Sequence, residues 1–157
     1  MPISERITSL FLRARLWLGE KRFGSLGPSV VKVSETRIIK GPCESAELEG
    51  LKHVAQYTST PVPKVYRTYY VSGRLFIEME YIQGVTLQAI WASLNLSSTK
   101  KQAIVKQVAT YIDQLRLLEP PQKGVVASAG LGQCLDYRVG YNPFGPFFNN
   151  EEFHSFL

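Results

Sequence analysis

Two apolar segments separated by a turn signal place the strongest constraint on the fold of this chain. Residues 64–71 and 74–81 are rich in β-branched and aromatic residues, which favour strands. Ser72 and Gly73 lie between them, and a two-residue turn of this kind joins antiparallel neighbours. The second segment leads into polar residues and Gly84, so it predicts a buried strand that exits into a short connector.

Three further short strands are predicted upstream of this hairpin. The turn residues Gly24 and Gly27 precede the β-branched run 30–33, and we expect the next strand to end at Gly41 and Pro42. Together with the hairpin, these strands predict a five-stranded antiparallel sheet.

Helical periodicity appears in three longer segments. Residues 3–20 predict an amphipathic helix that packs on the sheet, residues 44–57 a second helix, and residues 99–118 the longest helix, with Thr99 and Gln102 as a capping box. A last helix is expected from residue 151. The apolar side of the first helix consists of Ile7, Leu10, Phe11, Ala14, Trp17 and Leu18.

The order helix, three strands, helix, two strands and helices predicts an α+β fold. The chain of 157 residues divides into an N-terminal amphipathic helix at 1–22, a sheet domain at 23–84 and a mainly helical part at 85–157.

The basic charge is concentrated near the N-terminus. Residues 1–40 hold eight Lys or Arg against three Glu, whereas residues 41–157 hold ten charges of each sign. Such a surface attracts the phosphates of a nucleotide, of nucleic acid or of an anionic membrane, or is a solvated face with no specific partner. An arginine-rich amphipathic start is also typical of organelle transit peptides, but Glu5 and Glu20 argue against one.

Several partner and cofactor classes are not expected. Aromatic residues are not interleaved with the basic ones, so we expect no nucleic acid partner. No apolar run approaches the roughly 20 residues of a transmembrane segment. Cys43 and Cys134 match no metal-binding spacing and His53 and His154 are isolated, which predicts reduced thiols, a cytoplasmic protein and no metal site.

Lys40 and Glu47 are the first candidates for chemistry. A lysine at the end of a buried strand can offer its charge to phosphate oxygens, and a carboxylate on the next helix can hold it in place. Glu47 shares a helical face with Leu51 and Val54, so we expect it to face the sheet. Lys40 alone is also compatible with an ordinary surface lysine, and the spacing to Glu47 is what favours a site.

The exit of the last strand resembles the hinge with which kinases bind adenine through backbone groups. The matching groups are the carbonyl of Glu80 and the amide of Ile82, with Met79 behind them. A buried strand with a glycine-containing exit is an equally simple interpretation. Gly24 and Gly27 are weaker candidates for the same site, because two glycines in a turn-rich region match many loops.

Several runs together resemble the aminoglycoside phosphotransferase-like kinase family, in the form common in fungi. The match covers about residues 23–157 and rests on Val31, Lys40, Glu47 and the runs 58–66, 79–87 and 143–147. Its most specific piece is Thr-x-x-Pro-Val-Pro-Lys-Val, which begins at Thr58. The resemblance implies a protein-kinase-like fold, with the sheet and its crossing helix as N-lobe and 85–157 as an incomplete helical C-lobe.

The resemblance also implies roles for individual residues. Lys40 would contact the nucleotide phosphates, Glu47 would pair with it, and Glu80 and Ile82 would hold adenine. Family members phosphorylate hydroxyl groups of small molecules, so the resemblance implies ATP as cofactor.

The family's His-Gly-Asp-type catalytic loop and its later metal-binding aspartate have no counterpart in this sequence. Asp113 lies inside the long predicted helix and Asp136 in an irregular stretch. Phosphoryl transfer depends on positioning and on metal-borne charge neutralisation. We therefore expect a kinase-like protein that is catalytically silent and binds ATP weakly without a metal site.

Two other functions stay open. The chain is compatible with an interaction or scaffold module that forms a homodimer or captures a partner protein through residues 99–118 and 143–157. It is also compatible with a fold reused for small-molecule chemistry without phosphate.

Overall fold

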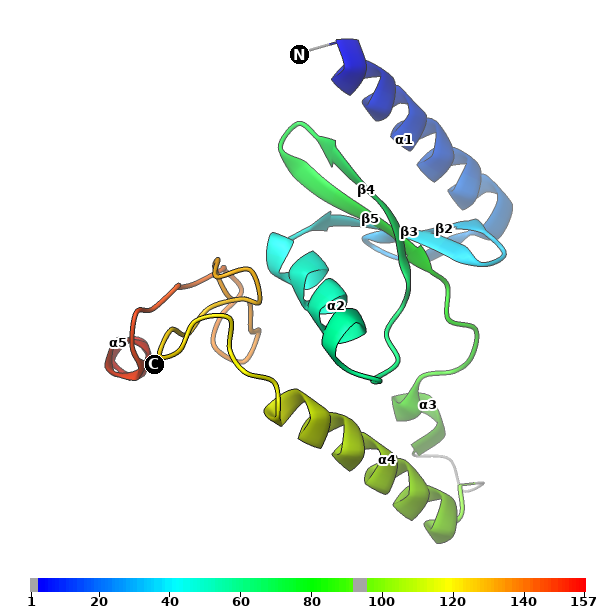
Figure 1. Cartoon of the computed structure of the whole chain (residues 1–157). Coiled ribbons are helices and arrows are strands. Elements are labelled where there is room, and N and C mark those ends of the chain that lie inside the picture. Colours follow the sequence, from blue (N-terminus) through cyan, green and yellow to red (C-terminus); the bar gives the residue numbers. More distant parts are fainter. Residues whose placement is uncertain (1–2, 92–95) are drawn as a thin grey trace.

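The computed structural model describes residues 3–91 and 96–157 of the chain (Figure 1). One antiparallel sheet of five strands has the order β1-β2-β3-β5-β4. The strands are β1 (Ser25–Gly27), β2 (Val30–Ser34), β3 (Arg37–Cys43), β4 (Val65–Val71) and β5 (Arg74–Glu80). The predicted α+β class and the antiparallel sheet are thereby confirmed.

The β4–β5 hairpin forms where the turn residues predict it. Val71 pairs with Arg74, and the ladder continues to Val65 opposite Met79. Ser72 and Gly73 have φ values of 50° and 72°, the left-handed conformation that a tight two-residue hairpin turn requires. This hairpin places the buried strand β5 between β3 and β4.

Two helices cover opposite faces of the sheet (Figure 1). Helix α2 (Ser45–Tyr57) contributes Leu48 to a core cluster with Leu75, Ile77 and Met79. Helix α1 (Ile3–Phe23) contributes Leu12 to a second cluster with Ile39 and Tyr69. Because strand side chains alternate between faces, one set of β3 and β5 residues meets α2 and the other meets α1.

The predicted orientation of α1 is wrong, although the helix packs on the sheet as expected and ends at Phe23, three residues past the predicted end. Its buried side carries Leu12 and Gly19, while Leu10 and Trp17 on the predicted inward side are exposed. The physical reason lies at Gly19, where an added Cβ would be 2.4 Å from the Lys32 carbonyl oxygen. Only glycine allows this close approach of α1 to β2, and the approach sets which side of α1 faces the sheet.

Strand β3 runs past Gly41 and Pro42 instead of ending there. The register shifts between Lys40 and Cys43, where an irregularity absorbs the proline that cannot donate to the ladder. Gly41 also fits closely: a Cβ there would lie 2.5 Å from the ring of Phe76. The strand therefore continues directly toward α2 and carries Lys40 to the start of that helix.

The C-terminal part contains α3 (Leu87–Trp91), α4 (Ser98–Arg116) and α5 (Asn150–Phe156), with irregular chain between α4 and α5. Helix α4 has 19 residues and α1 has 21, so the predicted longest helix is the second in length. Its cap is Ser97, whose hydroxyl accepts from the Lys100 amide, not the predicted capping box at Thr99. None of the described helices is both long and apolar enough to cross a membrane.

The irregular segment between α4 and α5 is attached to α2 through Glu49. Its carboxylate accepts hydrogen bonds from the Ser128 hydroxyl at 2.5 Å and the Gly130 amide at 3.0 Å. This contact joins the C-terminal part to the face of α2.

Candidate functional site

Lys40 and Glu47 form the ion pair that their spacing predicts. Lys40 lies near the end of β3 on the α2 face of the sheet, and Glu47 lies in the first turn of α2. The Lys40 Nζ is 2.6 Å from the Glu47 Oε1. The Lys40 side chain is 39% exposed, so its ammonium remains accessible to a ligand.

The surroundings keep Lys40 charged. Burial, the largest single influence, lowers the Lys40 pKa, but the hydrogen bond and the negative charge of Glu47 together outweigh it and leave the pKa raised. The neighbouring Cys43 behaves differently, because burial and the Glu47 charge raise its thiol pKa to about 11. The site therefore offers one fixed ammonium and a thiol that stays protonated at neutral pH.

The predicted hinge follows β5 at the opposite end of the β3–β5 ladder from Lys40. Met79 is buried in the α2-facing core, and the Glu80 amide donates to the Lys64 carbonyl at 2.9 Å. Ile82 is 61% exposed, and its amide makes no hydrogen bond to another described residue. That amide is thus available as a donor.

The β3–β5 register sets the distance between the two halves of the candidate site. Lys40 pairs with Ile77, and Glu80 lies three residues further along β5. At the usual rise of a strand, the two positions are about 10 Å apart. An extended nucleoside phosphate covers a span of this size.

The two candidate glycines have different surroundings. Gly27 pairs with Val30, which pairs with Lys40, so the turn between β1 and β2 lies beside the lysine. Gly24 instead ends α1, with φ 76° and an amide that donates to the Glu20 carbonyl. The structure brings only Gly27 of these two toward Lys40, and Gly24 has a clear role as a helix stop.

Five cavities in the described part of the chain are lined by residues other than Lys40, Glu47 and Glu80. An apolar groove of about 680 Å³ lies between α3 and α4 and is lined by residues that include Trp91, Val105 and Ile112. These five cavities therefore do not coincide with the candidate nucleotide site.

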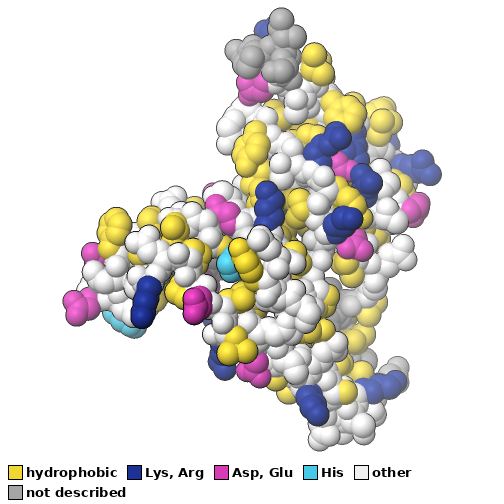
Figure 2. Space-filling view, viewed as in Figure 1, with side chains coloured by type: hydrophobic (Ala, Val, Ile, Leu, Met, Phe, Trp, Pro, Cys, Tyr) yellow, Lys and Arg dark blue, Asp and Glu magenta, His cyan; other side chains and the backbone are white. Residues whose placement is uncertain are grey.

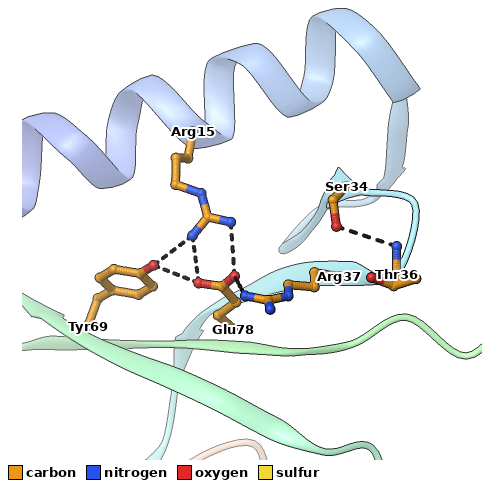
Figure 3. Close-up of polar contacts among 6 residues, drawn as sticks. All are labelled: Arg15, Ser34, Thr36, Arg37, Tyr69 and Glu78. Atoms are coloured by element: carbon orange, nitrogen blue, oxygen red, sulfur yellow. Dashed lines mark hydrogen bonds and ion pairs between the residues drawn. The ribbon is translucent and has the colours of Figure 1, made fainter.

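A buried carboxylate that the sequence analysis missed joins α1 to the sheet (Figure 3). Glu78 on β5 is 2% exposed, and its oxygens accept from Arg15 at 2.5 and 2.9 Å. Arg37 donates to the same carboxylate at 3.2 Å, and the Tyr69 hydroxyl donates at 2.7 Å. The available signal was a lone glutamate inside an otherwise apolar strand, together with an arginine one helical turn from the buried Leu12.

Burial alone would raise the pKa of Glu78, but the hydrogen bonds from Arg15 and Tyr69 and the arginine charges lower it to about 2. Arg15 pKa is raised in turn, chiefly by its hydrogen bond to Glu78. Glu78 lies on the sheet face opposite Lys40, because neighbouring strand positions alternate and Ile77 is the partner of Lys40. The cluster is therefore a structural link and separate from the candidate nucleotide site.

No group of three or more His, Cys, Asp or Glu side chains that could hold a metal occurs among the residues described. Asp136 is held by Arg138, whose guanidinium and amide hydrogen bonds lower the aspartate pKa to about 2. Asp113 lies on the exposed side of α4. The expectation of a chain without a metal site stays a prediction.

Comparisons with protein-family models, with curated proteins and with solved structures found no match for this chain. The resemblance to aminoglycoside phosphotransferase-like kinases therefore stays a prediction from the sequence runs that suggested it.

Proposed function

We propose that this chain is a kinase-like protein that binds a nucleotide weakly through Lys40 and the segment after β5 and does not transfer phosphate by itself. The observation that carries the proposal is the 2.6 Å ion pair between Lys40 and Glu47. In protein kinases a lysine on the third strand pairs with a glutamate on the following helix and contacts the nucleotide phosphates. Here Lys40 lies on β3, and Glu47 lies on α2, the next helix.

The exposed amide of Ile82 supports an adenine position at the other end of the site. It supplies one donor two residues past Glu80, and the position of Glu80 is about 10 Å from that of Lys40 by the strand rise. By the resemblance, the sheet and α2 correspond to a kinase N-lobe and residues 85–157 to a partial C-lobe. Gly27 lies across Val30 from Lys40, two strands away, and is the glycine that we assign to the phosphates.

We expect weak binding because both ends of the site are exposed, with the Lys40 side chain at 39% and Ile82 at 61%. Ligand sites that bind tightly are concave and bury most of the ligand surface, whereas none of the five described cavities includes Lys40. By the resemblance, the family's catalytic loop and metal-binding aspartate have no counterpart in this sequence, and without such groups most of the rate of phosphoryl transfer would be lost.

A thermal-shift titration with ATP tests the proposal. We expect the melting temperature to rise by several degrees once ATP reaches about 100 times its dissociation constant, since this stabilises the folded state by about 2.7 kcal/mol. Lys40→Met should abolish the shift relative to its own ligand-free melting temperature. Lys52→Met, at an exposed position of the same helix as Glu47, should keep it. Magnesium should change neither result.

A flat titration to millimolar ATP would remove nucleotide binding from the proposal. Phosphorylation of small alcohols or aminoglycosides that disappears in Lys40→Met would show instead that the chain is an active enzyme.

The exposed face of α4 favours a second candidate, a homodimer or a complex with a partner protein. Val105, Val108 and Ile112 are exposed along one side of α4 and border the groove with α3. The 143–157 segment exposes less aromatic surface than its aromatic content suggested, because several of its rings pack on one another. The ring centroids of Phe144 and Phe156 are 5.3 Å apart, and those of Phe147 and Phe153 are 5.5 Å apart. Phe148 stays 75% exposed. Light scattering should show a species heavier than 17.7 kDa that Val105→Ser/Val108→Ser returns to monomer.

A further inference from the structure

The side of α1 that faces away from the sheet carries a continuous row of large apolar side chains. We call this row the α1 stripe. It consists of Ile7, Leu10, Phe11, Trp17 and Leu18, each between 47% and 68% exposed. Their spacing places them on one face of the helix, so they form a stripe and not isolated exposed residues. The sheet cannot cover the stripe, because the opposite side of α1 holds Leu12 and Gly19 against it.

Basic side chains border the α1 stripe along its length. Arg6 precedes Leu10 by four positions, Arg13 precedes Trp17 by four, and residues four apart on a helix are surface neighbours. Lys21 and Arg22 follow at the C-terminal end, and all four basic residues are exposed. Figure 2 shows hydrophobic and basic side chains close together in the upper part of the molecule, over α1.

The acidic residues of α1 do little to offset this charge. Glu5 is turned toward the β4–β5 hairpin, where its carboxylate accepts from the Ser72 amide at 3.1 Å. Glu20 is exposed beside the C-terminal end of the stripe. The outward side of α1 therefore has four basic residues against one acidic residue, around an apolar row.

We propose that the α1 stripe lies flat on an anionic lipid surface. A helix with aromatic and aliphatic residues on one face and Arg or Lys beside them is suited to the boundary between headgroups and acyl chains. The apolar side chains enter the boundary, while the basic residues contact anionic headgroups. None of the described helices can cross a membrane, so the contact is peripheral.

The basic charge around the α1 stripe favours a lipid surface over a second copy of the chain. In a symmetric dimer the same patch meets itself, so Arg6, Arg13, Lys21 and Arg22 would face the same basic residues of the other copy. Like charges placed opposite one another disfavour that arrangement. An anionic membrane supplies both the apolar layer and the opposite charge.

Helix α1 also needs no folding step to bind. Its inner side is held by the Arg15 contacts to Glu78 and Tyr69 and by the close approach at Gly19. The stripe is therefore presented on a preformed helix, and binding avoids the entropic cost of ordering a free peptide. The candidate nucleotide site lies on the other face of the sheet, so the two proposals are independent.

Vesicle binding of the full chain with Trp91→Phe tests the proposal, because Trp17 is then the sole tryptophan. Vesicles with about 30% phosphatidylserine should shift the Trp17 emission to shorter wavelength, and brominated lipids should quench it. Purely phosphatidylcholine vesicles should bind much less, and added salt should reduce binding to the anionic vesicles.

Two variants separate the apolar and the electrostatic contributions. Leu10→Ser/Leu18→Ser should abolish the emission shift, while circular dichroism confirms that the fold is retained at these exposed positions. Arg6→Gln/Arg13→Gln should weaken partitioning about thirty-fold, since each basic residue near an anionic surface contributes about a five-fold change. Leu131→Ser/Tyr141→Ser removes exposed apolar surface away from α1 and from the other proposed binding surfaces, and it should bind as the parent does.

Three outcomes would overturn the proposal. They are the absence of an emission shift at millimolar anionic lipid, equal binding to neutral and anionic vesicles, and an equal loss of binding in the Leu131→Ser/Tyr141→Ser control. A dimer in light scattering that Leu10→Ser/Leu18→Ser dissociates would also overturn it and assign the stripe to a second copy of the chain.

Discussion

Replacing Glu78 with glutamine keeps the size of the side chain but removes the negative charge between Arg15 and Arg37. Glu78 is 2% exposed and accepts hydrogen bonds from both arginines and from Tyr69. Its pKa falls from 4.5 to about 2 in the folded protein. At 1.36 kcal/mol for each pKa unit, this difference corresponds to about 3 kcal/mol of stability. We expect Glu78→Gln to cost about this much at neutral pH, a large share of the 5–15 kcal/mol typical of a domain.

The pH dependence follows from the direction of the shift. Because the folded-state pKa of Glu78 is lowered, its contribution is fully present above the unfolded value of 4.5 and disappears as the pH falls through about 2. The difference in unfolding free energy between the parent and Glu78→Gln should therefore be constant from pH 7 to about 5 and shrink below that.

Urea unfolding followed by circular dichroism at pH 7, 5, 4 and 3 measures this difference. Glu35→Gln is the matched control, since Glu35 pairs with Lys32 at 3.2 Å on the surface and is 70% exposed. An exposed pair of this kind contributes only about 0.2–1 kcal/mol. A cost for Glu78→Gln no larger than the control, or a difference that stays constant from pH 7 to pH 3, would refute the reasoning.

Two further predictions concern local packing. Gly19→Ala should lower the free energy of unfolding by about 1–3 kcal/mol, because the added Cβ meets the Lys32 carbonyl oxygen. Gly50→Ala, in the open surroundings of α2, should raise it by about 0.5–1 kcal/mol. Equal melting temperatures for the two variants would contradict the close approach of α1 to β2. Ser97→Ala should cost about 1 kcal/mol in chemical unfolding through loss of the α4 cap, and a larger loss in Thr99→Ala would show that the helix begins differently.

The candidate site could be predicted from the sequence in one part and not in another. Glu47 follows Lys40 by seven positions, and a strand end followed directly by a helix brings such residues together without any distant contact. The hinge residues are likewise neighbours in sequence on β5 and its exit. Whether these two halves enclose a cavity depends on the packing of the C-terminal part, which local patterns do not report.

Composition and spacing by themselves determined the elements of this protein. The left-handed turn at Ser72 and Gly73, the helix start after Glu44 and the alternation along β5 all follow from preferences of a few neighbouring residues. The predicted bounds of α1, α2, α4, β4 and β5 lie within three residues of the observed ones, whereas β3 continues past Gly41 and the short helix α3 was not predicted.

Only the tertiary structure decided which side of α1 is buried and which charges meet. A helical apolar pattern indicates that one side prefers to leave water, but burial also requires a surface that the side can approach closely. Gly19 provides that approach on the less apolar side of α1, and the buried Glu78 binds Arg15 there across 63 residues of sequence. Both contacts join segments that are distant in the chain, so their energy is set by backbone geometry that no local pattern contains.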